Sequence, residues 1–114
     1  MNFKTDIRGD FLVISAVGDI NLNSDVSKLY LLVESGLAQG KKDIALSFTA
    51  ESFLYTRHIA VLVRALELIK DRGGSLTIIN PNKDIADVLF LIDPDSLIRQ
   101  AESEEALLAL PASR

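Results

Sequence analysis

Phenol, hydroxyl, guanidinium and imidazole groups follow one another in the segment Tyr55-Thr56-Arg57-His58. His58 is the one histidine of the chain, and a phosphorylated imidazole is stabilised when it lies at a helix N-terminus. The other parts of a small phosphoryl-transfer enzyme are missing: the sequence has no second His, no Cys, no P-loop and no tight carboxylate cluster. We therefore expect that the protein is not an enzyme, binds no cofactor and has no thiolate or His-rich metal site. A phosphoryl carrier or small enzyme that uses His58 is the less favoured alternative.

The composition is that of one globular domain covering residues 1–114. Of its 114 residues 48% are hydrophobic and 25% charged, and the net charge is −4. Sixteen acidic against twelve basic residues argue against nucleic-acid binding. The apolar runs are too short to span a membrane, and the polar start lacks the apolar region of a signal peptide, so we expect a cytoplasmic protein.

Strands and helices alternate along the chain. Short branched apolar runs predict strands, and apolar spacing of three and four residues predicts helices. The expected strands are 2–7, 11–17, 44–48, 75–80 and 97–100. The expected helices begin at a cap at Asn23 or Ser24, at Thr56, at Asn82 and at Ser103, and end near 40, 72, 92 and 111. This order predicts an α/β fold with a hairpin followed by mainly parallel pairing in a mixed sheet.

The helix after Thr56 is apolar over about twice the arc that a surface helix needs. Val61 and Leu68 lie outside its main stripe, beside the cationic Arg57 and Arg64. Either a neighbouring helix covers this extra surface, or the helix start forms a ridge that binds a partner or a second copy of the chain. The expected core is Phe11, Val13, Ile44, Leu46, Ile59, Leu62, Leu66, Ile69, Leu76 and Ile78.

Several segments, in this order and spacing, resemble the STAS domain family, which includes bacterial anti-sigma factor antagonists. They are a Gly-acid-aliphatic turn (18–21), the central strand (44–48) and the approach to a signature loop (52–54). The others are the helix after that loop (61–66), a Gly-Gly-strand-Asn-Pro run (72–81) and an acidic last helix (103–107). The resemblance covers nearly the whole chain and implies a single STAS-like domain.

In this family the signature loop reads Asp-Ser-Ser/Thr-Gly, and its first Ser is phosphorylated by a partner kinase. The matching positions here are Tyr55, Thr56, Arg57 and His58, so only Thr56 keeps the family's chemistry. Asn21 likewise stands where the family has an Asp in its first turn. The resemblance makes Thr56 the candidate phosphoacceptor, whereas the residues alone predict an N-cap that contributes about 1 kcal/mol. We expect His58 to be a surface or half-buried residue.

The resemblance implies a small regulator of the anti-sigma factor antagonist type. It would bind an anti-sigma factor or kinase-type ATPase through Asn21, Tyr55, Arg57, His58 and Val61, and phosphorylation of Thr56, paired by Arg57, would release the partner. The alternative is an adaptor subunit of a transport ATPase or sensory scaffold, bound without phosphorylation.

Overall fold

A β-hairpin begins the chain in the structure, a computed structural model that describes residues 1–93 and 97–111. Its strands are β1, Asn2–Arg8, and β2, Phe11–Val17, which pair antiparallel. Gly9 lies in the turn between them with a φ of 58°, a conformation that glycine adopts without strain.

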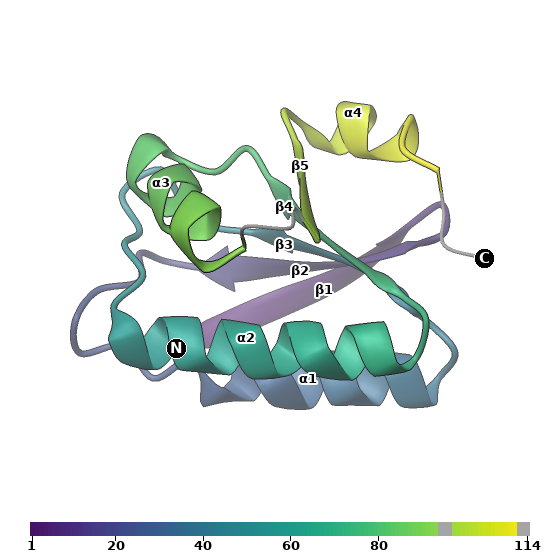
Figure 1. The fold of residues 1–114 in the computed structure, drawn as a ribbon, viewed down its shortest axis with the longest axis horizontal. Coiled ribbons are helices and arrows are strands. Elements are labelled where there is room, and N and C mark those ends of the chain that lie inside the picture. Colours follow the sequence, from purple (N-terminus) through teal and green to yellow (C-terminus); the bar gives the residue numbers. More distant parts are fainter. Residues whose placement is uncertain (94–96, 112–114) are drawn as a thin grey trace.

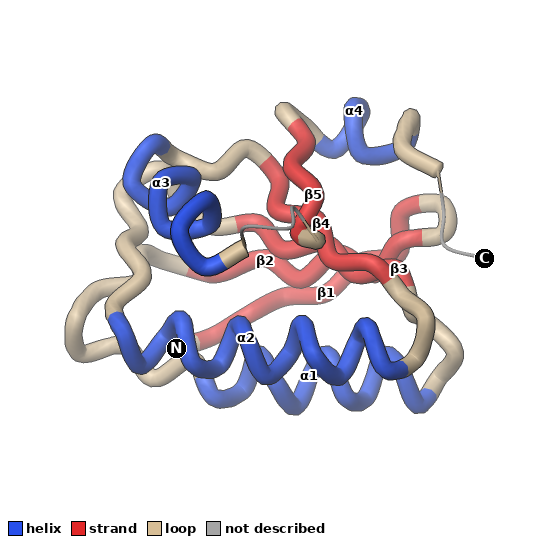
Figure 2. The backbone as a smooth tube through the Cα atoms, in the orientation of Figure 1, coloured by secondary structure: helices blue, strands red, loops and turns tan. Residues whose placement is uncertain are grey.

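The remaining strands are β3, Asp43–Ser47, β4, Ser75–Ile79, and β5, Ile98–Ala101. They add to the hairpin in parallel and in chain order, β1-β2-β3-β4-β5. The helices between and after them are α1, Ser27–Ala38, α2, Thr56–Asp71, α3, Lys83–Ile92, and α4, Glu104–Leu108. The predicted mixed, mainly parallel sheet with alternating helices is confirmed (Figures 1 and 2).

Two apolar clusters hold the helices against the sheet. The larger joins one face of the sheet to α1, α2 and α3, and includes Ile44, Leu46, Leu76, Ile78, Leu29, Val33, Leu62, Ile69 and Ile85. The smaller packs Leu107 of α4 against the other face, on Phe11, Val13, Ala45, Ile79 and Ala101. Eight of the ten residues expected in the core are buried, whereas Ile59 and Leu66 are half-buried and pack against the larger cluster.

Helices α1 and α2 run side by side beneath the sheet in the view of Figure 1 and contact each other. Val61 and Leu68 of α2 are half-buried and pack against the larger cluster. The guanidinium carbon of Arg64 lies 4.7 Å from the ring centroid of Tyr30 on α1. The extra apolar arc of α2 is therefore covered in good part by its neighbour, the first of the two interpretations.

Local capping explains two helix starts and corrects a third. Asn82 accepts a hydrogen bond from a backbone N–H of the first turn of α3, as predicted, and Ser103, where the last helix was expected to begin, does the same for α4. The cap expected at Asn23 or Ser24 is wrong, because α1 begins at Ser27 after Val26. Ser24 Oγ instead accepts from the N–H of Asn21, 3.0 Å away, so this polar run forms a loop.

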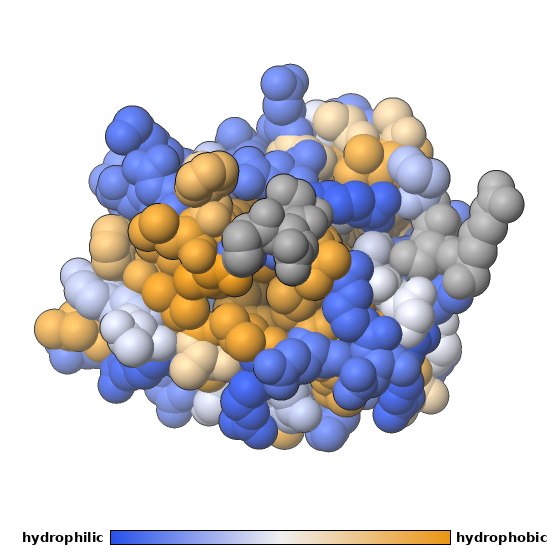
Figure 3. Space-filling view, viewed as in Figure 1, coloured by the Kyte–Doolittle hydropathy of each residue, from blue (hydrophilic) through white to orange (hydrophobic). Residues whose placement is uncertain are grey.

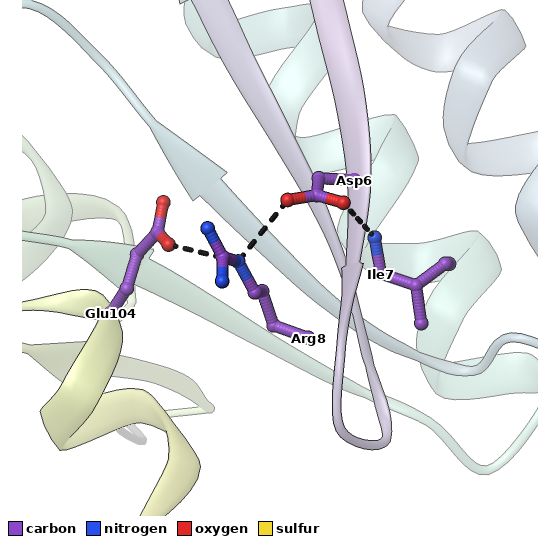
Figure 4. Close-up of polar contacts among 4 residues, drawn as sticks. All are labelled: Asp6, Ile7, Arg8 and Glu104. Atoms are coloured by element: carbon purple, nitrogen blue, oxygen red, sulfur yellow. Dashed lines mark hydrogen bonds and ion pairs between the residues drawn. The ribbon is translucent and has the colours of Figure 1, made fainter.

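The hairpin also contacts the last helix through side chains. Arg8 Nε lies 3.1 Å from Asp6 Oδ2 and 3.2 Å from Glu104 Oε2, and the other Asp6 oxygen accepts from the N–H of Ile7 (Figure 4). These groups are well exposed, so the ion pairs orient α4 more than they stabilise it.

Candidate functional site

Two loops meet at one edge of the sheet and frame the start of α2. The β2–α1 loop, residues 18–26, and the β3–α2 loop, residues 48–55, follow the carboxyl ends of neighbouring parallel strands. Ile20 N–H donates to Ser52 Oγ at 2.9 Å, and Phe53 N–H donates to the Ile20 carbonyl at 2.9 Å. The side-chain amide of Asn82, before α3, donates to the Ser52 carbonyl at 2.7 Å. These bonds fix the β3–α2 loop from both sides.

The N-cap of α2 is Tyr55, and Thr56 is the first residue of the helix. The prediction of Thr56 as N-cap is therefore wrong by one position. The side-chain bond at this end of α2 comes from His58, whose Nδ1 accepts from the N–H of Tyr55, and the carbonyl of Tyr55 accepts from the N–H groups of His58 and Ile59, both at 2.9 Å. Thr56 is exposed, so its hydroxyl lies at the solvent-facing start of the helix.

His58 lies inside the molecule rather than at its surface, and only 2% of it is exposed. Its Nδ1 accepts from the N–H of Tyr55 at 3.0 Å, and its Nε2 lies 2.9 Å from the carbonyl oxygen of Ser24. The expected surface or half-buried position is wrong, because the ring bridges α2 and the β2–α1 loop. With both nitrogens engaged, His58 offers neither a partner contact nor a free nitrogen for a phosphoryl group.

Arg57 reaches across to the same loop. Its Nη2 donates to the Leu22 carbonyl at 2.6 Å and to the Ser24 carbonyl at 2.9 Å. The residue is exposed, but its guanidinium already has partners. In this structure the Arg57 guanidinium binds the β2–α1 loop and is not free to pair with a phosphate on Thr56.

Two aromatic rings stand at the exposed side of this edge. The rings of Phe53 and Tyr55 are 4.7 Å apart between centroids, and each residue is 38% exposed. Leu22, in the adjoining loop, is also an exposed apolar residue. Phe53 and Leu22 were not predicted as site residues; the available signal was an apolar residue inside a polar loop and an aromatic two positions before Tyr55.

The remaining predicted contacts, Asn21 and Val61, differ in exposure. Asn21 is exposed, and its side-chain oxygen accepts from the N–H of Asn23 at 3.0 Å, which shapes the loop. Val61 is half-buried and lines a cavity of about 140 Å³. The other residues lining that cavity are Ser24, Asp25, Val26, Arg57 and His58. The structure thus brings together all of the predicted positions, with Asn21, Tyr55, Thr56 and Arg57 outside and His58 inside.

A second apolar surface lies on α3. Phe90 is 81% exposed and Leu91 77%. Figure 3 shows apolar surface gathering over α3 and the part of the molecule between α3 and α2. Exposed apolar surface of this kind is common at interaction sites, and neither residue was predicted as a site residue.

Neither a metal centre nor a membrane span is found in the part of the chain that the structure describes. Within residues 1–93 and 97–111, no three His, Cys, Asp or Glu side chains are grouped as metal ligands. None of the helices in these ranges has both the length and the hydropathy of a membrane-spanning segment.

Solved structures with the same fold come from anti-sigma factor antagonists, although no protein-family model and no curated protein matches the sequence. TM1081, solved by NMR, is 18% identical over 96% of this chain and 87% of its own, with a TM-score of 0.76. The crystal structure of TM1081, from Thermotoga maritima and described as a candidate anti-sigma factor antagonist, gives a TM-score of 0.72 at 19% identity over 94% and 92%.

Bacillus SpoIIAA, a cell fate determinant solved in its phosphorylated form, is 17% identical over 96% of this chain and 100% of its own, with a TM-score of 0.73. Its unphosphorylated form, named as an anti-sigma factor antagonist, gives 0.71 at 17% identity over 95% and 96%. The hairpin, the parallel strands and the helices of this chain thus form a STAS-like fold, the fold of the anti-sigma factor antagonists.

Proposed function

We propose that this chain is a regulatory protein-binding domain that docks a partner on the exposed edge at the start of α2. One observation carries the proposal: the paired rings of Phe53 and Tyr55 lie next to the exposed hydroxyl of Thr56. Aromatic residues are enriched among those that contribute most to protein–protein affinity. A partner over these rings would also cover Leu22 and Asn21, which the hydrogen bonds of Arg57 and His58 keep beside α2.

The partner that best fits the fold is an anti-sigma factor or kinase-type ATPase, and we expect the exchange to take place in the bacterial cytoplasm. SpoIIAA, which shares the fold, has been solved both phosphorylated and unphosphorylated. On Thr56 a phosphate would lie at the positive end of the α2 dipole, where the domain itself tolerates it. Its charge of about −1.5 to −2 would oppose an apolar interface over Tyr55 and release the partner.

A second candidate is an adaptor bound by the same edge without phosphorylation, in a transport ATPase or a sensory scaffold. The position of Arg57 favours it, because its guanidinium is engaged by two backbone carbonyls and not held ready for a phosphate. The two candidates share the docking edge and differ in whether Thr56 is modified.

The test compares wild type with Thr56→Glu, Tyr55→Ala and the control Thr56→Val as baits in the native host's lysate. We expect wild type and Thr56→Val to capture the same partner, and the other two variants to bind it about tenfold more weakly or worse, the loss usual for a central contact. Glu at the first helical position suits the helix dipole, so the fold of Thr56→Glu is retained.

Mass spectrometry of the recovered bait separates the two candidates. Acid-stable phosphate on Thr56, with capture of a kinase-type ATPase, supports the regulator. Capture of a transporter or scaffold with Thr56 unmodified in every fraction supports the adaptor. Equal affinity of all four baits would show that the partner binds elsewhere, with the surface of Phe90 and Leu91 as the next to test.

A further inference from the structure

We propose that His58 is a proton-sensitive bridge: its neutral ring closes the start of α2 while it bonds the β2–α1 loop, and protonation of the ring opens the α2 side of the bridge. The inference concerns the free domain. It does not depend on which partner binds, or on whether Thr56 is phosphorylated.

The two bonds of the ring allow one protonation state. A backbone N–H can only donate, so the Nδ1 that faces the N–H of Tyr55 at 3.0 Å must carry no proton. A carbonyl oxygen can only accept, so the Nε2 that faces Ser24 at 2.9 Å must carry one. The bridge is therefore a neutral imidazole with its proton on Nε2.

Adding a proton to Nδ1 breaks the bridge at α2. The new N–H would point at the N–H of Tyr55, leaving two donors face to face and the amide without an acceptor. This amide belongs to the N-cap residue, so loss of its hydrogen bond loosens the point where the β3–α2 loop enters the helix. A side chain at the third helical position that accepts from the N-cap N–H is half of a capping box, and here His58 takes the place usually held by Glu or Gln.

Cationic and dipolar groups also lie beside the ring. Arg57 Nη2 and His58 Nε2 both contact the carbonyl oxygen of Ser24, so protonation would place two cations on one acceptor. The ring lies in the first turn of α2, which is the positive end of the helix dipole and contains no acidic residue. The ring of Tyr55 contacts the imidazole edge-on, with 5.8 Å between centroids.

Asp25 is the acidic residue among those lining the adjoining cavity, and its carboxylate already accepts from the N–H of Ser27 at 2.9 Å. The protonated ring keeps its Nε2 bond to Ser24, and Arg57 holds the same loop, so the change is confined to the start of α2 beside Tyr55.

Nuclear magnetic resonance of the whole chain tests the bridge directly, because His58 is its one histidine and the ring signals need no assignment. We expect the ring nitrogen shifts at about pH 8 to show the tautomer with its proton on Nε2. As the ring nitrogen shifts report protonation, the protection factor of the Tyr55 amide should fall at least about tenfold.

The matched variant is His58→Gln, whose side-chain oxygen accepts from an N-cap N–H but does not titrate. We expect it to keep the Tyr55 amide protected at every pH. A proton on Nδ1 at about pH 8, a ring that is protonated without loss of protection at the Tyr55 amide, or a ring that stays neutral throughout would overturn the proposal. The same loss of protection in His58→Gln would also overturn it, and wild type alone decides the matter should the variant not fold.

Discussion

Asp25 shows how a fully exposed side chain can still shape the site. Its Oδ1 accepts at 2.9 Å from the N–H of Ser27, the first residue of α1. Hydrogen bonds from the N–H and the side chain of Ser27 lower the pKa of Asp25 below its ordinary value of 3.8. The ionised carboxylate is therefore the form that suits the folded β2–α1 loop.

Stability gained from Asp25 should be lost in acid. Because its pKa is lower in the folded chain, the gain is fully present above the unfolded value of 3.8 and disappears as the pH falls through the folded value. We expect Asp25→Asn to unfold more readily than wild type near about pH 7, and the difference to shrink below about pH 3. Urea midpoints at the two pH values measure it, with Asp10→Asn in the hairpin turn as control. If the stability difference between wild type and Asp25→Asn is the same at both pH values, the hydrogen bond from Ser27 does not depend on the charge of Asp25.

Thr77, at the centre of β4, carries a buried hydroxyl that lowers the stability of the fold. It is fully buried, and its Oγ1 has no hydrogen-bond partner among the described residues. A buried hydroxyl without a partner costs free energy that an apolar group of the same shape does not.

Thr77→Val should raise the free energy of unfolding by about 1 kcal/mol, because it removes the unpaired hydroxyl and keeps the branched shape. Thr49→Val is the opposite case, since the Thr49 hydroxyl bonds Asp19 and Ser52, and it should lower stability by about the same amount. Urea denaturation compares the two. A loss of stability in Thr77→Val would show that its hydroxyl is satisfied in solution.

Among the elements, the connection from α2 to β4 requires both of its glycines, for different reasons. Gly73 has a φ of 73°, the left-handed conformation that ends many helices, and the N–H of Gly74 donates to the Ile69 carbonyl at 3.0 Å. Gly74 lies so close to β3 that a Cβ there would collide with the carbonyl oxygen of Lys42. That carbonyl accepts from the N–H of Ser75, which aligns β4 with β3.

Gly74→Ala should therefore lower the free energy of unfolding by about 1–3 kcal/mol, the usual cost of overpacking. Ser35→Ala, at an exposed position of α1, should change it by less than about 0.5 kcal/mol. Thermal unfolding followed by circular dichroism measures both. A wild-type melting temperature in Gly74→Ala would mean that the start of β4 can move away from β3 without loss.

At the scale of the whole molecule, Arg99 of β5 joins three parts of the chain on the α4 side of the sheet. Its Nη2 donates to Ser75 Oγ at 2.8 Å, and its Nη1 donates to the Pro111 carbonyl beyond α4 at 2.8 Å. Ser75 in turn donates to the buried Asp43 of β3 at 2.7 Å. The chain after β5 is thus held to the sheet by polar bonds as well as by Leu107.

Arg99→Met, which keeps the apolar stem, should cost about 1–3 kcal/mol of stability because Ser75 and Pro111 each lose a charged donor. The stability of Arg99→Lys should fall between those of wild type and Arg99→Met, since an ammonium keeps the charge but lacks the planar fork that reaches both acceptors. Hydrogen exchange should accelerate in α4 and leave α1 unchanged. Equal protection of α4 in all three proteins would show that Leu107 alone holds the helix.

Prediction from the sequence succeeds here where the deciding interaction is local or periodic. The side chains of Asn82 and Ser103 each accept from the N–H of the residue three positions later, and short apolar runs such as 44–48 and 75–80 mark buried strands. The α1 start fails because Ser24 and Asp25 have other polar partners nearby, and a propensity for capping does not choose between them. Thr56 is misplaced by one residue for a related reason, since the cap of α2 uses the side chain of His58.

The sequence by itself determined the order of strands and helices, the mixed sheet and most of the core, because the spacing of apolar side chains states which face of each element is buried. Only the tertiary structure decided which residues at the start of α2 face outward. His58 and Ser24 are 34 positions apart, and Arg57 and Leu22 are 35. Whether a ring at the helix start is surface or bridge depends on where a distant loop packs, and no local pattern in the chain records that position.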